Sequence, residues 1–181
     1  MQIDAVGCME GVRFISSPNC DERPAEGAIN LLVIHNISLP PGEFGGESVI
    51  DLFTNRLDPQ AHPYFQTIRD LKVSAHFFIR RDGEIIQFVP CGKRAWHAGE
   101  SAWQGKTRCN DFSVGVELEG SDTRPFTGDQ YQALVALTLA LRKAYPLVDI
   151  VGHADIAPGR KTDPGPHFDW EGYRMALITP V

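Results

Sequence analysis

Residues 152–166, which read GHADIAPGRKTDPGP, constrain the fold of this chain more than any other stretch. Each of the three prolines removes a backbone donor and fixes φ, and the glycines punctuate the chain further. We therefore predict a rigid polar loop here and no helix. The loop carries a potential metal ligand near each end, His153 and Asp163. A rigid loop holds such side chains in fixed positions, as metal-assisted hydrolysis requires.

The rest of the chain alternates between the hydrophobic periods of strands and of helices. Strands are predicted at residues 31–36, 77–79, 85–89, 113–119 and 149–151, and helices at 48–57, from 63 onward, at 127–145 and at 169–178. The Asp82-Gly83 pair predicts a tight turn that joins two of the strands in a hairpin. Interleaved strands and helices indicate an α/β (α+β) fold. We predict one domain over residues 1–181, with a mixed central β-sheet flanked by helices.

Charge and cysteine content exclude several classes of protein. The net charge is −6 and there is no basic run, so we expect no nucleic-acid partner. No apolar run reaches 18 residues, so we expect no membrane-spanning helix. The four cysteines are scattered, without a CxxC pair, and residues 1–7 contain no basic region and no long apolar stretch, so we expect no secretory signal. We therefore expect reduced thiols and a cytoplasmic location.

Three candidate metal ligands follow predicted strands or lie in the rigid loop: His35, His153 and Asp163. Two imidazoles and one carboxylate leave a fourth position of a zinc ion open, as catalytic zinc requires. Spacing alone also allows three unrelated polar residues, because no HExxH motif is present. The other histidines are competitors, with His76 a candidate core residue and His97 a candidate pocket wall; they are His62, His76, His97 and His167.

Seven sequence blocks occur in order between about residue 12 and residue 173. They are VIHNISLPPG (33–42), VSAH (73–76), IRRDG (79–83), RAWHAG (94–99), CNDFS (109–113), GVELEG (115–120) and residues 152–166. Together they resemble the AmpD-type N-acetylmuramoyl-L-alanine amidases, which share a fold with the peptidoglycan recognition proteins. The resemblance implies zinc at His35, His153 and Asp163. It also implies a cytoplasmic recycling enzyme that cleaves 1,6-anhydro-N-acetylmuramyl peptides, and so a muropeptide substrate.

Glu117 and Glu119 alternate with apolar residues in the predicted strand 113–119, so both side chains lie on one face. Amide hydrolysis needs a group that takes a proton from water and passes it to the leaving amine. We assign this role to Glu117, which the resemblance supports. Glu119 is the alternative base, or a residue that orients a zinc-bound imidazole. Lys161, two residues before Asp163, is assigned the stabilisation of the oxyanion.

The resemblance places substrate contacts at Asn36, Lys72, Ala95, Trp96 and Arg108. The family usually has arginine before the VSAH block, and this chain has Lys72 there. Lysine keeps the charge but loses the planar fork that binds a carboxylate with two hydrogen bonds. We therefore expect a weaker or water-mediated anchor at this position.

Three questions remain open at this point. The same fold also occurs in non-catalytic modules that bind peptidoglycan fragments, although the intact ligand set disfavours such a sensor. An exported amidase that acts on intact cell wall is a further alternative. The glycine- and proline-rich residues 38–46 form either a lid over the substrate or a static brace.

Overall fold

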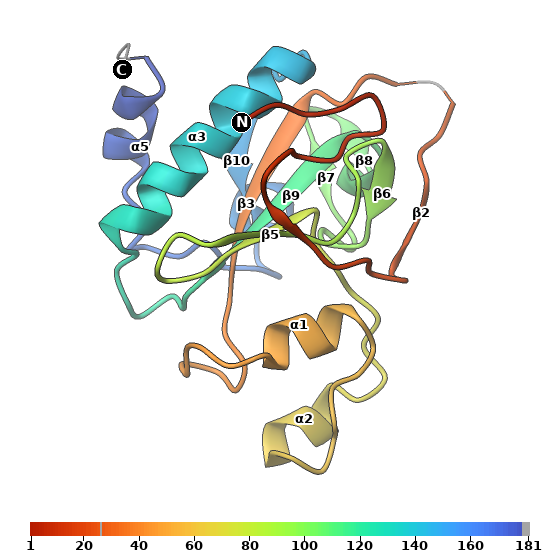
Figure 1. The fold of residues 1–181 in the computed structure, drawn as a ribbon, viewed down its shortest axis with the longest axis vertical. Helices are drawn as coiled ribbons and strands as arrows, with labels where there is room; N and C mark the ends of the chain where they lie inside the picture. Colours follow the sequence, from red (N-terminus) through yellow and green to blue (C-terminus); the bar gives the residue numbers. More distant parts are fainter. Residues whose placement is uncertain (26, 179–181) are drawn as a thin grey trace.

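The fold is built on a six-stranded mixed sheet with the strand order β1-β5-β4-β9-β3-β10 (Figure 1). The computed structural model describes residues 1–25 and 27–178. The strands of this sheet are β1 (Arg13–Phe14), β3 (Leu31–Ile37), β4 (Phe77–Ile79), β5 (Ile85–Gln87), β9 (Ser113–Glu119) and β10 (Asp149–Gly152). Strands β4, β9, β3 and β10 are mutually parallel, whereas β5 is antiparallel to β4. The predicted mixed sheet with flanking helices is confirmed.

Helices cover both faces of the sheet (Figure 1). The long α3 (Gly128–Ala144) and α5 (Trp170–Ala176) lie side by side on one face, over the apolar side chains Leu32, Ile34 and Val116. The short α1 (Ser48–Phe53) and α2 (Pro63–Thr67) pack on the other face. Because side chains alternate along a strand, the residues of β3 and β9 that point away from α3 remain available for a site.

Smaller elements complete the face opposite α3. They are the strand pairs β2 (Cys20–Glu22) with β6 (Lys93–Ala95) and β7 (Ala102–Trp103) with β8 (Lys106–Thr107), the 3-10 turn η1 (Cys109–Asp111) and the one-turn helix α4 (His153–Ile156). None of the helices in the described ranges is long and apolar enough to cross a membrane.

Two predicted boundaries are wrong by about one helical turn, and the strand expected at 85–89 is shorter and ends at Gln87. The helix expected at 48–57 ends at Phe53, and the chain then turns through Asn55, which has a φ of 58°. The start of the segment 152–166 is the helix α4 and not a loop, because its first proline, Pro158, comes only after that turn is complete. The remainder of the segment is irregular, as predicted.

A capping box starts the longest helix, α3. Thr127 Oγ1 accepts from the Gln130 amide at 3.1 Å, and Gln130 Oε1 accepts from the Thr127 amide at 3.1 Å. Replacing Thr127 by alanine is expected to lower the free energy of unfolding by about 1 kcal/mol. Chemical denaturation measures this loss, and Thr107→Ala, at an exposed strand position, is the control. An unchanged unfolding midpoint in Thr127→Ala would contradict the capping role.

Candidate metal centre and catalytic cavity

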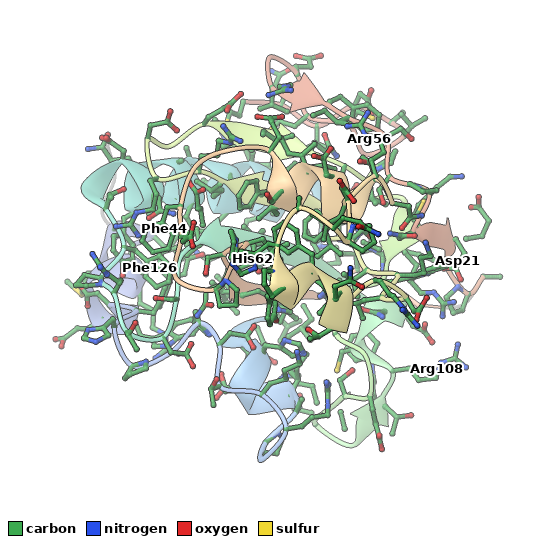
Figure 2. All side chains as sticks on the ribbon, turned by 90° about the horizontal axis from the view of Figure 1, so that it is seen from below. Asp21, Phe44, Arg56, His62, Arg108 and Phe126 are labelled. Atoms are coloured by element: carbon green, nitrogen blue, oxygen red, sulfur yellow. The ribbon has the colours of Figure 1, made fainter. Side chains whose placement is uncertain are left out.

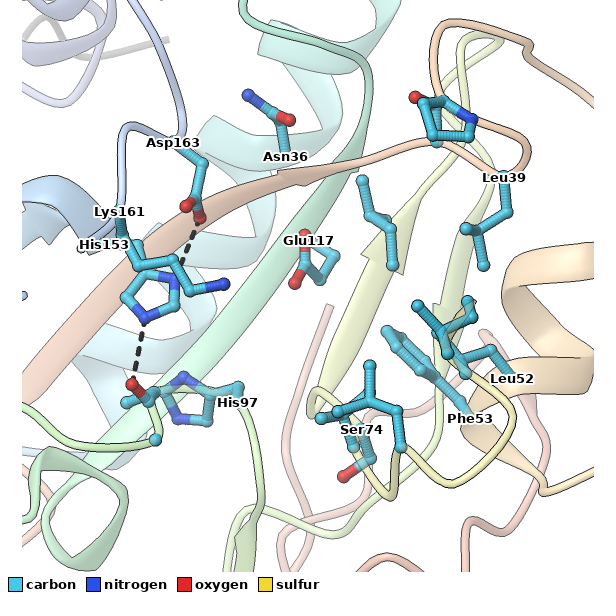
Figure 3. Close-up of a pocket in the computed structure, with 18 of the residues that line it drawn as sticks. Asn36, Leu39, Leu52, Phe53, Ser74, His97, Glu117, His153, Lys161 and Asp163 are labelled. Atoms are coloured by element: carbon cyan, nitrogen blue, oxygen red, sulfur yellow. Dashed lines mark hydrogen bonds and ion pairs between the residues drawn. The ribbon is translucent and has the colours of Figure 1, made fainter. Parts of the chain in front are cut away.

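Three candidate ligand atoms meet at one point on the face opposite α3, and two of the side chains, His153 and Asp163, are shown in Figure 3. His35 Nδ1 lies 3.0 Å from His153 Nδ1 and 3.0 Å from Asp163 Oδ2. His153 Nδ1 lies 3.1 Å from the same carboxylate oxygen. All three ligand atoms lie within 4.8 Å of one another, so this group could hold a metal ion. The predicted triad is therefore brought together by the fold.

The convergence follows from the sheet. Strand β10 pairs with β3 in parallel, with Gly152 opposite Ile34, so His153 emerges beside His35. The Ala154 amide donates to the Asp163 carbonyl at 2.9 Å, which draws the end of the loop back onto α4. A side chain at Gly152 would lie 2.7 Å from Pro164, so only glycine permits this approach. The Asp155 carboxylate accepts from the Gly152 amide at 2.7 Å and so satisfies a free amide at the start of α4.

The hydrogen bonds of His153 determine which of its nitrogens can bind a metal. Its Nε2 lies 3.0 Å from the carbonyl oxygen of Ala98, drawn as a dashed line in Figure 3. A carbonyl only accepts, so Nε2 carries the proton and Nδ1 keeps its lone pair. That lone pair points toward His35 and Asp163. This tautomer is the one that ligation through Nδ1 needs.

The charge states of His35 and Asp163 also suit a cation. Burial lowers the pKa of His35 to about 4, so its imidazole is neutral at pH 7. Burial acts to raise the pKa of Asp163, but hydrogen bonds to His153 and His35 outweigh it and hold this pKa well below its usual range. A neutral imidazole and an ionised carboxylate are the forms that bind metal ions.

Glu117 lies beside this group. It is the register partner of His35 across β3 and β9, and its Oε1 is 3.9 Å from His35 Nδ1. Its Oε2 is buried and has no hydrogen-bond partner among the described residues. Burial raises the pKa of Glu117 well above its ordinary value, the charge of Asp163 raises it further, and Lys161 lowers it. A buried carboxylate oxygen without a partner is costly, which points to a ligand or reactive water at this position.

Glu119 lies on the same strand face but has a different environment. Its carboxylate accepts from the Gly45 amide at 2.5 Å and from the Arg81 amide at 2.9 Å. It therefore fastens residues 38–46 and the β4–β5 turn to the end of β9. These contacts favour a static brace over a mobile lid for residues 38–46. Among the described residues, no hydrogen bond joins Glu119 to His35 or His153.

A cavity of about 700 Å³ opens beside the ligand group. Seven of the predicted site residues line it: three of the five assigned to the substrate, both of those assigned to catalysis and two of the three candidate ligands. These are Asn36, Lys72, Trp96, Glu117, Lys161, His153 and Asp163. Lys161 extends from its loop toward Glu117 (Figure 3).

Two predicted substrate residues do not line this cavity. Ala95 lies in β6 and packs into the apolar cluster beneath α1. Arg108 is exposed at the edge of the molecule (Figure 2), where its Nε lies 3.3 Å from Asp111 Oδ2 and its side chain borders a separate hollow with Glu100. The sequence around these two residues gives no local signal of which way their side chains point.

The other histidines occupy different settings. The Nδ1 of His76 accepts from the Gly115 amide and its Nε2 contacts the Lys93 carbonyl, so it is the satisfied core histidine that was expected. His62 caps α2, and His167 is exposed. His97 lines the cavity, as expected, but it also contacts His35 directly. Sequence inspection also missed Asp122, whose carboxylate accepts from Asn36 Nδ2 at 2.7 Å.

A mixed sheet that presents two imidazoles, a carboxylate and a second carboxylate with an unpaired oxygen to a cavity indicates a class of protein: an α/β enzyme with a candidate metal-dependent hydrolytic site. Residues 25–166 match the N-acetylmuramoyl-L-alanine amidase family. The chain belongs to that family.

Sequence and structure comparisons with individual proteins of this family support the assignment. The chain is 58% identical over 173 residues to the 1,6-anhydro-N-acetylmuramyl-L-alanine amidase AmpD of Escherichia coli K12, covering 94% of each chain. A crystal structure of a selenomethionine AmpD derivative superposes with a TM-score of 0.95 at 56% identity, covering 98% of this chain and 99% of that one. The AmiD amidase of E. coli, solved with the substrate anhydro-N-acetylmuramic acid-L-Ala-D-γ-Glu-L-Lys, superposes with a TM-score of 0.63 at 32% identity, covering 88% of this chain and 62% of that one.

Proposed function

We propose that this chain is a zinc amidase that hydrolyses the bond between 1,6-anhydro-N-acetylmuramic acid and L-alanine in muropeptides. The observation that carries the proposal is the ligand triad beside the buried, unpaired oxygen of Glu117 at the cavity. The activity named for the AmpD relative and the substrate bound by the AmiD structure support the choice of substrate.

The donor set suits zinc. His35, His153 and Asp163 offer two imidazole nitrogens and one carboxylate oxygen, a combination found in catalytic zinc sites that keep one position open. Zinc supplies Lewis-acid chemistry, which makes water more acidic and a carbonyl carbon more open to attack. Proton transfer, stabilisation of the developing charge and substrate binding are assigned to side chains of the protein.

Glu117 is the proposed general base. Its Oε1 lies 3.9 Å from a ligand nitrogen, so a water bound near the triad is within reach of the carboxylate. The unpaired Oε2 has no competing donor among the described residues, so the carboxylate is free to take a proton. The same group then passes that proton to the departing alanine amine.

Lys161 is the proposed stabiliser of the charge that develops on the carbonyl oxygen. Its ammonium enters the cavity from the loop that also carries Asp163. Lys161→Met is expected to lower kcat by about 100-fold, the scale for loss of one oxyanion donor. Lys106→Met, in β8 outside the cavity, is the control, and equal kcat in both variants would remove Lys161 from the reaction.

Three side chains are proposed to hold the substrate. Lys72 offers a cation to a stem-peptide carboxylate, and Trp96 offers an aromatic wall. Asn36 is oriented by Asp122, which leaves the amide oxygen available to a peptide N–H. Ala95 and Arg108 lie outside the cavity, so neither is given a direct contact here.

The cellular setting is proposed to be cytoplasmic recycling of peptidoglycan. All four cysteines are free thiols, which is typical of a reducing compartment. The family match spans residues 25–166, and the proposed catalytic domain extends over the whole chain, residues 1–181.

The proposal is tested by mass-resolved product analysis. The protein is incubated with purified anhydromuropeptide, with the non-anhydro muropeptide and with intact sacculi. We expect release of the free stem peptide from the anhydro substrate at the highest rate. Equal rates on all three substrates would reject the recycling assignment, and binding without product would instead support a non-catalytic module.

A further inference from the structure

We propose that His97 is a positioning residue for the metal centre: it accepts a hydrogen bond from His35 Nε2 and so keeps His35 Nδ1 free to bind the metal. This inference rests on the proposed zinc site and adds to it a residue outside the ligand set. His97 contacts His35 and not the metal position, so its action is indirect.

The contact between the two rings is short and buried. His35 Nε2 lies 2.9 Å from His97 Nδ1. The ring centroids are 5.0 Å apart and the ring planes meet at 86°. His35 is fully buried and His97 is 8% exposed. A buried N–H without a partner is destabilising, so the acceptor matters for the tautomer of His35.

Binding of a cation fixes the direction of this hydrogen bond. An imidazole that ligates through Nδ1 carries its proton on Nε2. The proton of His35 then points at His97 Nδ1, which must present a lone pair. His97 must in turn carry its own proton on Nε2, and that atom lies 3.1 Å from Ser113 Oγ, which can accept it. The three residues His35, His97 and Ser113 therefore form one directed chain.

The surrounding structure fits His97 closely. A side chain at Gly115 would lie 2.4 Å from the His97 ring, so the ring can pack against β9 only because this position is glycine. The Asn110 side-chain oxygen accepts from the amides of His97 and Ala98, at 3.2 and 2.8 Å. The next residue, Ala98, supplies the carbonyl that accepts from His153 Nε2. Two consecutive residues thus provide the acceptors for both ligand histidines.

His76 provides an internal comparison. Its ring centroid lies 5.8 Å from that of His97, and it is also buried, with 0% of its surface exposed. Its two ring nitrogens contact the backbone groups of Gly115 and Lys93, and no hydrogen bond joins it to a ligand among the described residues. Loss of His76 should therefore affect folding without affecting the metal, whereas loss of His97 should affect the metal.

Zinc affinity of purified variants tests the proposal, with Zn²⁺ alone as the probe and a chromogenic chelator as competitor. His97→Phe keeps a ring against Gly115 but removes the acceptor, and we expect its affinity to fall by about 10- to 100-fold. His97→Asn keeps an acceptor close to the position of Nδ1, and its affinity should stay within a few-fold of the wild type. His76→Asn should lower the unfolding temperature of the metal-free protein and leave zinc affinity unchanged. Wild-type affinity in His97→Phe would overturn the proposal, as would an equal loss in His97→Asn and His97→Phe.

A second measurement on the wild-type protein does not depend on the folding of any variant. Nitrogen-15 NMR of the histidine side chains in the zinc-loaded protein should show both His35 and His97 with the proton on Nε2. A proton on Nδ1 of His97 would overturn the proposal. Failure of the wild type to bind zinc would contradict the proposed function itself, whereas unchanged zinc affinity in His97→Phe would contradict only the role of His97.

Discussion

Replacing Glu117 by glutamine is expected to lower kcat on anhydromuropeptide by about 100-fold or more, the scale for loss of a general base. Glutamine keeps the shape of the side chain but cannot take a proton from water. The three ligand side chains are untouched, so zinc content should match the wild type. Stopped assays that quantify free stem peptide, combined with metal analysis of the same sample, separate loss of chemistry from loss of metal.

Glu119→Gln is the matched control, since both glutamates lie on the same face of β9. The Glu119 carboxylate binds the amides of Gly45 and Arg81 and has no contact with the imidazole ligands. We therefore expect its substitution to loosen residues 38–46 and to reduce kcat by less than tenfold, since the proton transfer itself is intact. Normal turnover in Glu117→Gln together with loss in Glu119→Gln would transfer the role of base to Glu119.

Removal of the metal is expected to abolish hydrolysis completely. Dialysis against a chelator leaves Glu117 and Lys161 in place but removes the Lewis acid, and neither side chain activates an amide carbonyl alone. Added zinc should restore the original rate. Product release from demetallated protein, measured with and without added zinc, checks this, and full activity after demetallation would contradict the metal mechanism.

Substitution of a proposed metal ligand tests the same metal dependence by mutation. His153→Ala removes one of the two imidazoles and should not recover activity when zinc is added. His167→Ala is the control, because that histidine is exposed and lies outside the ligand group. Equal behaviour of the two variants would exclude His153 as a ligand.

Much of the fold could be predicted because the responsible signals are local. The alternation of β9, the Asp-Gly turn after Arg81 and the capping box at Thr127 each lie within a few residues. The two wrong boundaries also have local causes, but the sequence pattern does not show which of the competing local signals prevails. One helical turn fits between Gly152 and Pro158 because a proline limits only the residues close to it.

The site was less predictable, because it depends on which strands are neighbours. Spacing along the chain gave no reason for His35 to meet His153, which lies 118 residues away. The pairing of β3 with β10 brings them together, and the sequence does not specify strand order. The contact of His97 with His35 was missed for the same reason: the segment between β6 and β7 crosses over β9, and the only trace in the sequence is the glycine at position 115.

The register of β3 against β9 places His35 directly opposite Glu117. The separation of the proposed ligand from the proposed base is therefore set by the distance between neighbouring strands, about 4.8 Å, and not by the surface loops. For protein engineering, this makes reactivity and substrate choice separately adjustable. The segment from α2 to β4, which contributes Lys72 to the cavity, can be lengthened, shortened or exchanged to accept other stem peptides while the spacing of the reacting groups stays constant.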